Sequence, residues 1–156
     1  MIRHKPLKIP ASEKQELRTQ FGALCFRIHK GKVQVLLVTG RRSGRWIIPK
    51  GWPINKATPA DSALKEAWEE AGVIGKQAGE CLGIYSHYRT DPAIRYPNVV
   101  AVFPVLVSDT KEDYPEAGER QRKWFGVKKA AATVHNAELA QMIEAFGKRM
   151  EDRNLH

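Results

Sequence analysis

The chain has 156 residues, of which 42% are hydrophobic and 28% charged, and this balance excludes a disordered or fibrous protein. The length suits one domain with a single core, so we expect residues 1–156 to form one unit. No apolar run approaches the roughly 20 residues that a membrane helix requires, and residues 1–10 lack the apolar stretch typical of secretion. We therefore expect a cytoplasmic protein.

The net charge of +9 is unevenly distributed along the chain. The first 50 residues carry +10, whereas residues 51–73 carry −2. Such a field favours a polyanionic partner, which could be a nucleotide, a polyphosphate, RNA or a membrane surface. The alternative is that solvated basic side chains only increase solubility.

Cysteine and histidine residues do not indicate a metal centre. Cys25 and Cys81 lie far apart, each with apolar neighbours, and this favours two reduced core thiols over a disulfide or a metal pair. The 5 histidines have no metal-ligand spacing, so we expect no zinc site.

Several segments have the composition of strands. Residues 21–28 and 33–38 are rich in β-forming residues and are separated by a turn-like break, which predicts a hairpin. Further along the chain we predict a second pair of strands at 78–87 and 98–107, an acidic loop at 109–118, a short strand at 121–127 and an amphipathic helix at about 137–150.

A helix is predicted between the two pairs of strands. Thr58 is a typical N-cap residue, Pro59 suits the first helical position, and Gly72 suits the C-terminal cap. Small apolar residues line one side of this helix. Three carboxylates share its other side, which we expect to face solvent: Glu66, Glu69 and Glu70.

These carboxylates would destabilise an isolated helix. Glu66 and Glu70 are like charges four residues apart, and all three glutamates lie where the helix dipole disfavours negative charge. A hard divalent cation relieves this conflict because it binds carboxylate oxygens, and magnesium also binds substrate phosphates. The alternative is an ordinary charged helix end, paired with Lys65 or another base.

Residues 51–73 resemble the Nudix box, the pattern G-x5-E-x7-R-E-U-x-E-E-x-G-U in which U is aliphatic. The pattern aligns with all 23 positions from Gly51 to Val73 without an insertion or deletion. Two positions depart from the pattern, because Ala57 replaces the first glutamate and Lys65 replaces the arginine.

The resemblance extends over residues 20–130, to the diphosphoinositol polyphosphate and diadenosine polyphosphate phosphohydrolase branch of the Nudix superfamily. It is carried by the segments LCFR at 24–27, VLLV at 35–38, WIIP at 46–49, EEAGV at 69–73 and RKWF at 122–125. The resemblance implies an α/β fold, in the form of an α/β/α sandwich around a mixed sheet with a catalytic loop and helix.

The resemblance also implies roles for individual residues. Glu66 and Glu70 correspond to metal ligands, with the backbone carbonyl of Lys50 or Gly51 as a further ligand. Glu69 corresponds to the residue that activates or orients water. Lys65, at the position of the arginine that braces the glutamates, cannot make the same bidentate contact, because an ammonium group is a point donor. The implied cofactor is Mg²⁺, with Mn²⁺ as a possible substitute.

Phosphate binding is expected from the basic first third of the chain. The segment 39–45 combines glycines with arginines, a composition suited to cradling phosphates, although a solvated turn is the alternative. The leading candidates are Arg18, Arg41 and Arg42, followed by Arg89 and Lys128.

The expected function is Mg²⁺-dependent hydrolysis of a diphosphate linkage in a highly anionic small molecule, such as a diphosphoinositol polyphosphate or a dinucleoside polyphosphate. One alternative is removal of pyrophosphate from the 5′ end of RNA. Another is a binding module without turnover, which the departures at Ala57 and Lys65 would favour. No membrane or protein partner is expected.

Overall fold

The computed structural model describes residues 5–6, 19–87 and 98–154. In these residues a sheet combines eight strands, and three helices accompany it. None of the described helices is both long and apolar enough to cross a membrane. The strands are β1 (Thr19–His29), β2 (Lys32–Thr39), β3 (Trp46–Ile47), β4 (Lys50–Gly51), β5 (Val73–Gln77), β6 (Gly83–His87), β7 (Asn98–Thr110) and β8 (Arg122–Gly126); the helices are α1 (Pro59–Ala71), α2 (Val127–Thr133) and α3 (Ala137–Asn154).

The sheet is mixed. Its main hydrogen-bonded path runs β3-β2-β1-β7-β5, while β4 pairs with β1, β6 with β7 and β8 with β2. The central strands β1 and β7 are parallel, with Gln20 opposite Val100, and the other pairs are antiparallel. The two-residue strand β4 is joined to β1 with Gly51 opposite Phe21, so that the loop before α1 is attached to the centre of the sheet.

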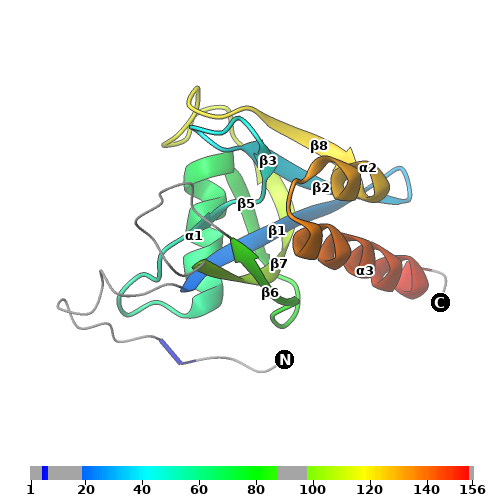
Figure 1. Ribbon diagram of the computed structural model, residues 1–156, viewed down its shortest axis with the longest axis horizontal. Helices are drawn as coiled ribbons and strands as arrows, with labels where there is room; N and C mark the ends of the chain where they lie inside the picture. The colour runs from blue at the N-terminus through cyan, green and yellow to red at the C-terminus, as the bar shows by residue number, and fades with distance from the viewer. Residues whose placement is uncertain (1–4, 7–18, 88–97, 155–156) are drawn as a thin grey trace.

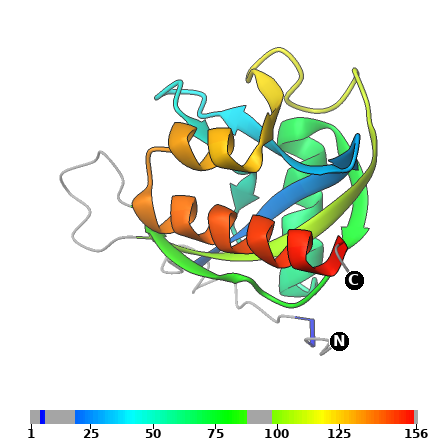
Figure 2. The ribbon, with the colours of Figure 1, turned by 90° about the vertical axis from the view of Figure 1, so that its right-hand side faces the viewer.

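Helices cover both faces of the sheet, with α1 on one face and α2 and α3 on the other (Figures 1 and 2). Each face has its own hydrophobic cluster, because successive residues of a strand point to opposite sides. The α1 side includes Phe21, Ala23, Cys25, Ala63, Ala67 and Phe103, and the α3 side includes Leu24, Phe26, Val102, Leu139, Ile143 and Phe146. The predicted α/β/α sandwich with a mixed sheet is confirmed.

The α1 helix begins and ends where the sequence predicts. The side chain of Thr58 accepts a hydrogen bond of 3.1 Å from the backbone N–H of Asp61. Gly72 ends the helix in the left-handed conformation, with φ 66° and ψ 27°, a backbone shape that favours glycine. The small side chains of α1 pack on β1 and leave the glutamates for the opposite side of the helix.

Three predicted boundaries are wrong. The strand expected at 78–87 is shorter and begins at Gly83 as β6, because residues 78–82 form a connection from β5, a strand that was not predicted. Ala78 and Leu82 still pack against the α3-side cluster, so their apolar character reflects burial of a loop and not strand alternation. The acidic loop begins later than expected because β7 continues to Thr110, and α3 continues to Asn154.

Two further features differ from the sequence analysis. The helix α2 was not expected, since its seven residues are too few for a periodic pattern. Cys81 is exposed, which corrects its assignment to the core, whereas Cys25 is buried as predicted. Burial, with a smaller effect of Glu70, raises the pKa of Cys25 to about 12, so this thiol stays protonated.

Candidate active site

The three glutamates of the box lie in the C-terminal half of α1. Glu70 is the most buried of them, with 3% of its surface exposed, while Glu66 and Glu69 are half-buried. Strand β4 and the segment 111–122 surround this end of the helix, as their contacts described next show.

Gly51 provides the space for the Glu66 side chain. A Cβ atom built on Gly51 would overlap the carboxyl carbon and Oε1 of Glu66. The carboxylate therefore rests against the backbone of β4 at the one residue type that has no side chain to exclude it. Gly51 is also paired with Phe21 of β1, so both residues of this contact, Gly51 and Glu66, belong to regular secondary structure.

Glu70 is held at both carboxylate oxygens. The backbone N–H of Lys50 donates to Oε2 at 2.9 Å, and the Arg120 guanidinium lies 2.9 Å from Oε1 through Nη2. Strand β4 thus lies beside Glu66 through Gly51 and beside Glu70 through Lys50. This arrangement brings together the four residues that the sequence analysis assigned to the metal.

Arg120 and Glu116 are residues of the site that the sequence analysis missed. Arg120 Nε donates to Glu116 Oε1 at 3.1 Å, and Arg120 Nη1 donates to the backbone carbonyl of Thr39 at 3.0 Å. The only available signal was that Glu116 lies in an acidic loop, since nothing local relates residues 116–120 to a helix some 50 positions earlier.

Burial and mutual repulsion act on the carboxylates. Burial, followed by the charges of Glu70 and Glu69, raises the pKa of Glu66 from 4.5 to about 7. Burial likewise raises the pKa of Glu70 from 4.5 to about 7, although Arg120 and the Lys50 hydrogen bond oppose the rise. Burial and the neighbouring carboxylates therefore oppose ionisation of both groups, and a bound cation would favour it.

The donor set fits a hard divalent cation. Glu66 and Glu70 offer carboxylate oxygens beside the backbone of Lys50 and Gly51, and Gly51 leaves a cradle that any side chain would fill. Within the described ranges no three Asp, Glu, His or Cys side chains form a ready-made metal centre. The two carboxylates Glu66 and Glu70 fit Mg²⁺, which binds through one or two carboxylates and completes its shell with waters and substrate phosphates.

Lys65 and Glu69 form a separate pair on the surface of α1. Lys65 Nζ lies 3.8 Å from Glu69 Oε1, and more than half of the Lys65 side chain is exposed. The backbone carbonyl of Glu69 accepts a 3.0 Å hydrogen bond from the N–H of Glu116. Lys65 is thus a surface partner of Glu69, the residue expected to act on water.

The arginine turn that follows β2 lies beside the segment 111–122. Arg41 is 3.3 Å from Glu119 and 3.7 Å from Glu116, and Arg42 is exposed in the same turn. Lys128 is exposed on α2, which covers the other face of the sheet from α1. Arg18 and Arg89 lie outside the described residues. The structure therefore brings Arg41, but not Lys128, to an acidic cluster that consists of Glu66, Glu69, Glu70, Glu116 and Glu119.

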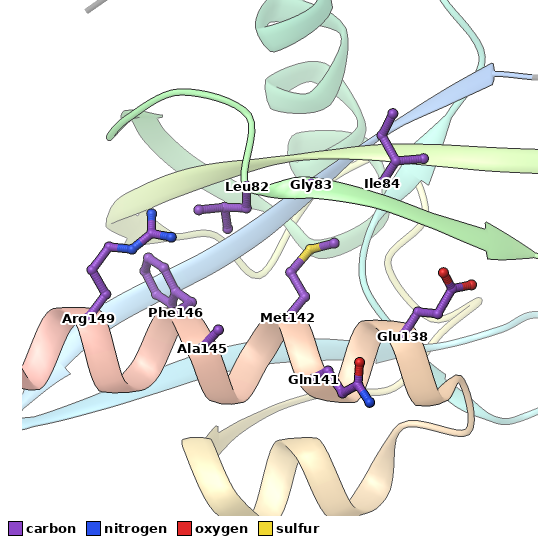
Figure 3. Close-up of a pocket in the computed structure, with 9 residues that line it drawn as sticks. All are labelled: Leu82, Gly83, Ile84, Glu138, Gln141, Met142, Ala145, Phe146 and Arg149. Carbon is purple, nitrogen blue, oxygen red and sulfur yellow. The ribbon is translucent and has the colours of Figure 1, made fainter.

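A groove of 280 Å³ lies between α3 and the start of β6 (Figure 3). Its lining includes Leu82, Ile84 and Met142, with Glu138 and Arg149 at the helix side. The groove is on the α3 side of the sheet, whereas the carboxylates of α1 are on the other side. It is not part of the candidate active site.

Comparison with known proteins identifies relatives along most of the chain. The NUDIX domain family matches residues 18–146. Nudix hydrolase 21, chloroplastic, of Arabidopsis thaliana is 34% identical over 134 residues, which cover 83% of this chain and 66% of that protein. Diphosphoinositol polyphosphate phosphohydrolase 2 of Homo sapiens is 31% identical over 150 residues, which cover 92% of this chain and 78% of that protein.

Solved structures share the fold. A binary complex of C. elegans Ap4A hydrolase aligns with a TM-score of 0.72 at 18% identity, covering 86% of this chain and 98% of that one. The NUDIX domain of Shewanella oneidensis NrtR aligns with a TM-score of 0.65, also at 18% identity. The match over residues 18–146 contains every described element from β1 to β8. This chain belongs to the Nudix hydrolase family, whose members act on pyrophosphate bonds and typically use a divalent metal.

Proposed function

We propose that this protein hydrolyses a diphosphate linkage in a highly anionic small molecule with the help of Mg²⁺. The observation that carries the proposal is the position of Glu66 and Glu70, whose carboxylates lie against adjacent residues of β4. The substrate is a diphosphoinositol polyphosphate or a dinucleoside polyphosphate. We also propose that the whole chain is a single Nudix unit located in the cytoplasm.

Four residues hold the cation in this proposal: Glu66 and Glu70 through carboxylate oxygens, and Lys50 or Gly51 through a backbone carbonyl. Mn²⁺ can substitute for Mg²⁺ because it accepts the same oxygen ligands. When bound, the cation neutralises charge on the phosphate oxygens and helps to position the attacking water.

Glu69 orients or activates the attacking water. Its carboxylate is half-buried at the same end of α1 as Glu66 and Glu70. Lys65 Nζ, 3.8 Å away, restrains one carboxylate oxygen of Glu69. Because this pair is largely exposed, its energetic contribution is small, and we assign Lys65 an auxiliary role in catalysis.

Arg41 and Arg42 bind substrate phosphates, together with Arg18 and Arg89, while Lys128 adds to the positive field. The position of Arg41 supports this role, because Arg41 lies beside the acidic cluster in which we propose that the cation binds. Its ion pair with Glu119 is exposed and spans 3.3 Å, so a substrate phosphate with more charge can displace the carboxylate.

The relatives support the substrate class. Human proteins named diphosphoinositol polyphosphate phosphohydrolases are 30% to 31% identical to this chain. Basic charge near the site, from Arg41 and Arg42, suits a compact molecule with many phosphates. No protein or membrane partner is part of the proposal.

Two other functions fit the same fold. A 5′-pyrophosphohydrolase of RNA would use the same carboxylates, with the basic first 50 residues along the nucleic acid. A binding module without turnover is favoured by Ala57 and Lys65, which depart from the Nudix box.

The test is phosphate release from three kinds of substrate, with and without Mg²⁺: diphosphoinositol polyphosphates, diadenosine polyphosphates and RNA with a 5′-triphosphate. We expect Mg²⁺-dependent release from one of the first two. Glu70→Gln should lower kcat by about 10²-fold or more, because a metal ligand is lost. Glu144→Gln, at an exposed position of α3, is the matched control and should leave kcat unchanged.

Each alternative gives a different result. Release from RNA alone identifies the 5′-pyrophosphohydrolase. Tight binding of a polyphosphate without release in any divalent metal identifies the binding module. Release that persists unchanged in both Glu69→Gln and Glu70→Gln shows that these glutamates do not have the proposed roles.

A further inference from the structure

Arg120 connects three parts of the fold at the candidate active site. It lies just before β8, and 9% of its side chain is exposed. Its guanidinium contacts the carbonyl of Thr39 at the end of β2, Glu116 in the acidic loop and Glu70 on α1, at 3.0, 3.1 and 2.9 Å. A buried arginine with an acceptor for each of its three nitrogens is a fixed element of the structure.

The geometry of these contacts requires an arginine. The planar guanidinium presents its donors in a rigid fork, and here Nε, Nη1 and Nη2 each serve a different acceptor. A lysine ammonium carries the same charge on a single atom, so it cannot reach three acceptors arranged around a plane.

Glu70 depends on Arg120 for its orientation. The Lys50 N–H donates to Oε2 of its carboxylate and Arg120 pairs with Oε1, while the charge of Lys50 also favours the ionised form. On α1 itself the nearest basic side chain, Lys65, pairs with Glu69 on the exposed surface and not with Glu70. The second anchor of Glu70 therefore comes from a segment 50 residues away in the sequence.

We propose that Arg120 is a positioning residue for the metal site: it holds the Glu70 carboxylate in the orientation that binds the cation and ties that orientation to Glu116 and to the end of β2. This inference rests on the proposed role of Glu70 as a metal ligand. It assigns to Arg120 no contact with the cation.

The experiment measures Mn²⁺ binding by electron paramagnetic resonance, without substrate, in wild type, Arg120→Met and Arg120→Lys. We expect the affinity for Mn²⁺ to fall about tenfold or more in both variants, as is typical when a hydrogen-bond partner of a metal ligand is removed. In assays of phosphate release, raising Mg²⁺ should restore much of the lost kcat, while KM for the substrate stays close to wild type.

Arg122→Met is the matched control. Arg122 belongs to the same segment and donates to the carbonyl of Ala71 at 2.7 Å, but it does not contact Glu70. Its loss removes an arginine contact to the end of α1 without changing the Glu70 carboxylate. We expect this variant to lose stability and to keep the wild-type affinity for Mn²⁺.

Three outcomes would overturn the inference. Unchanged or tighter Mn²⁺ binding in Arg120→Met would show that Arg120 does not position a ligand. Full recovery in Arg120→Lys, which also serves if the Met variant does not fold, would show that charge alone is needed. A raised KM with normal Mn²⁺ affinity would make Arg120 a substrate contact. If wild type and Glu70→Gln bind Mn²⁺ equally, the proposed role of Glu70 fails instead.

Discussion

At the scale of single residues, the contact between Gly51 and Glu66 is the most demanding feature of the site. The Glu66 carboxylate occupies space that a Cβ at residue 51 would need. Gly51 does not require a left-handed backbone, since no positive φ is found for it. Glycine is therefore needed at this position for close approach and not for conformational freedom.

Gly51→Ala should move Glu66 away from β4. Because misplacement of a reacting group by about 1 Å can cost about 10²-fold in rate, we expect kcat to fall by about that factor. Gly126→Ala is the control, since a Cβ at residue 126 meets nothing within 4 Å. Steady-state kinetics with a thermal melt of each variant would check this, and unchanged kcat in Gly51→Ala would contradict it.

The raised pKa values of Glu66 and Glu70 make the metal-free protein sensitive to pH. Both carboxyls have folded pKa values of about 7 against 4.5 for the ordinary group, so the folded state binds more protons than the unfolded chain between these values. Their contribution to stability is therefore fully present below about pH 4.5 and is lost as the pH rises through about 7.

Glu66→Gln should stabilise the metal-free protein, and increasingly so at higher pH. In the presence of EDTA we expect the Tm of the variant minus that of wild type to grow from about pH 5 to about pH 8, because only wild type acquires a charge at residue 66 that repels Glu70. Mg²⁺ should raise the Tm of wild type and not of the variant. Glu144→Gln, at an exposed site, should show neither effect. A difference that shrinks with pH would contradict the assignment.

At the scale of elements, the segment 111–122 holds the C-terminal end of α1. The N–H of Lys111 donates to the carbonyl of Gly72 at 2.9 Å, that of Glu116 to Glu69 at 3.0 Å, and Arg122 to Ala71 at 2.7 Å. The last turn of α1 has no basic residue of its own. The segment thus supplies the positive charge that a helix C-terminus favours.

Arg122→Met should lower the free energy of unfolding by about 1–2 kcal/mol, the range for a cation at a partly buried helix C-terminus. Arg122 is mostly buried and also contacts Glu112, which is almost fully exposed, so most of the loss comes from the helix end. Urea unfolding would measure it. A loss below about 0.3 kcal/mol would show that the backbone hydrogen bonds from Lys111 and Glu116 stabilise the end of the helix without a contribution from Arg122.

The sequence predicts the structure correctly where the signal comes from residues that are close together in the chain. Thr58, Pro59 and Gly72 predict the bounds of α1. The spacing of the glutamates predicts that all three face solvent, and this is wrong for Glu70, which is buried where its carboxylate meets Arg120 and the backbone of Lys50. Local patterns could not place the start of β6 at Gly83, because Ala78 and Leu82 are apolar for reasons of tertiary packing. They also could not find Arg120, since its contacts join residues that only the sheet brings together.

At the scale of the whole molecule, the sheet positions basic and acidic segments side by side. Arg41, from the basic first 50 residues, lies 3.7 Å from Glu116 and 3.3 Å from Glu119 in the segment 111–122. Of the proposed phosphate ligands, the structure brings Arg41 to the acidic cluster and leaves Lys128 on the other side of the sheet. Charge totals along the sequence predicted the positive field but not this separation.

The most direct test of the central claim is the location of Mn²⁺ in crystals, found from its anomalous scattering after a soak. We predict a peak within coordination distance of the carboxylates of Glu66 and Glu70, beside the backbone of Lys50 and Gly51, and no such peak in Glu70→Gln crystals. The claim would be contradicted by crystals of catalytically active protein in which Mn²⁺ binds elsewhere and Glu70 keeps only its contacts with Arg120 and the Lys50 N–H.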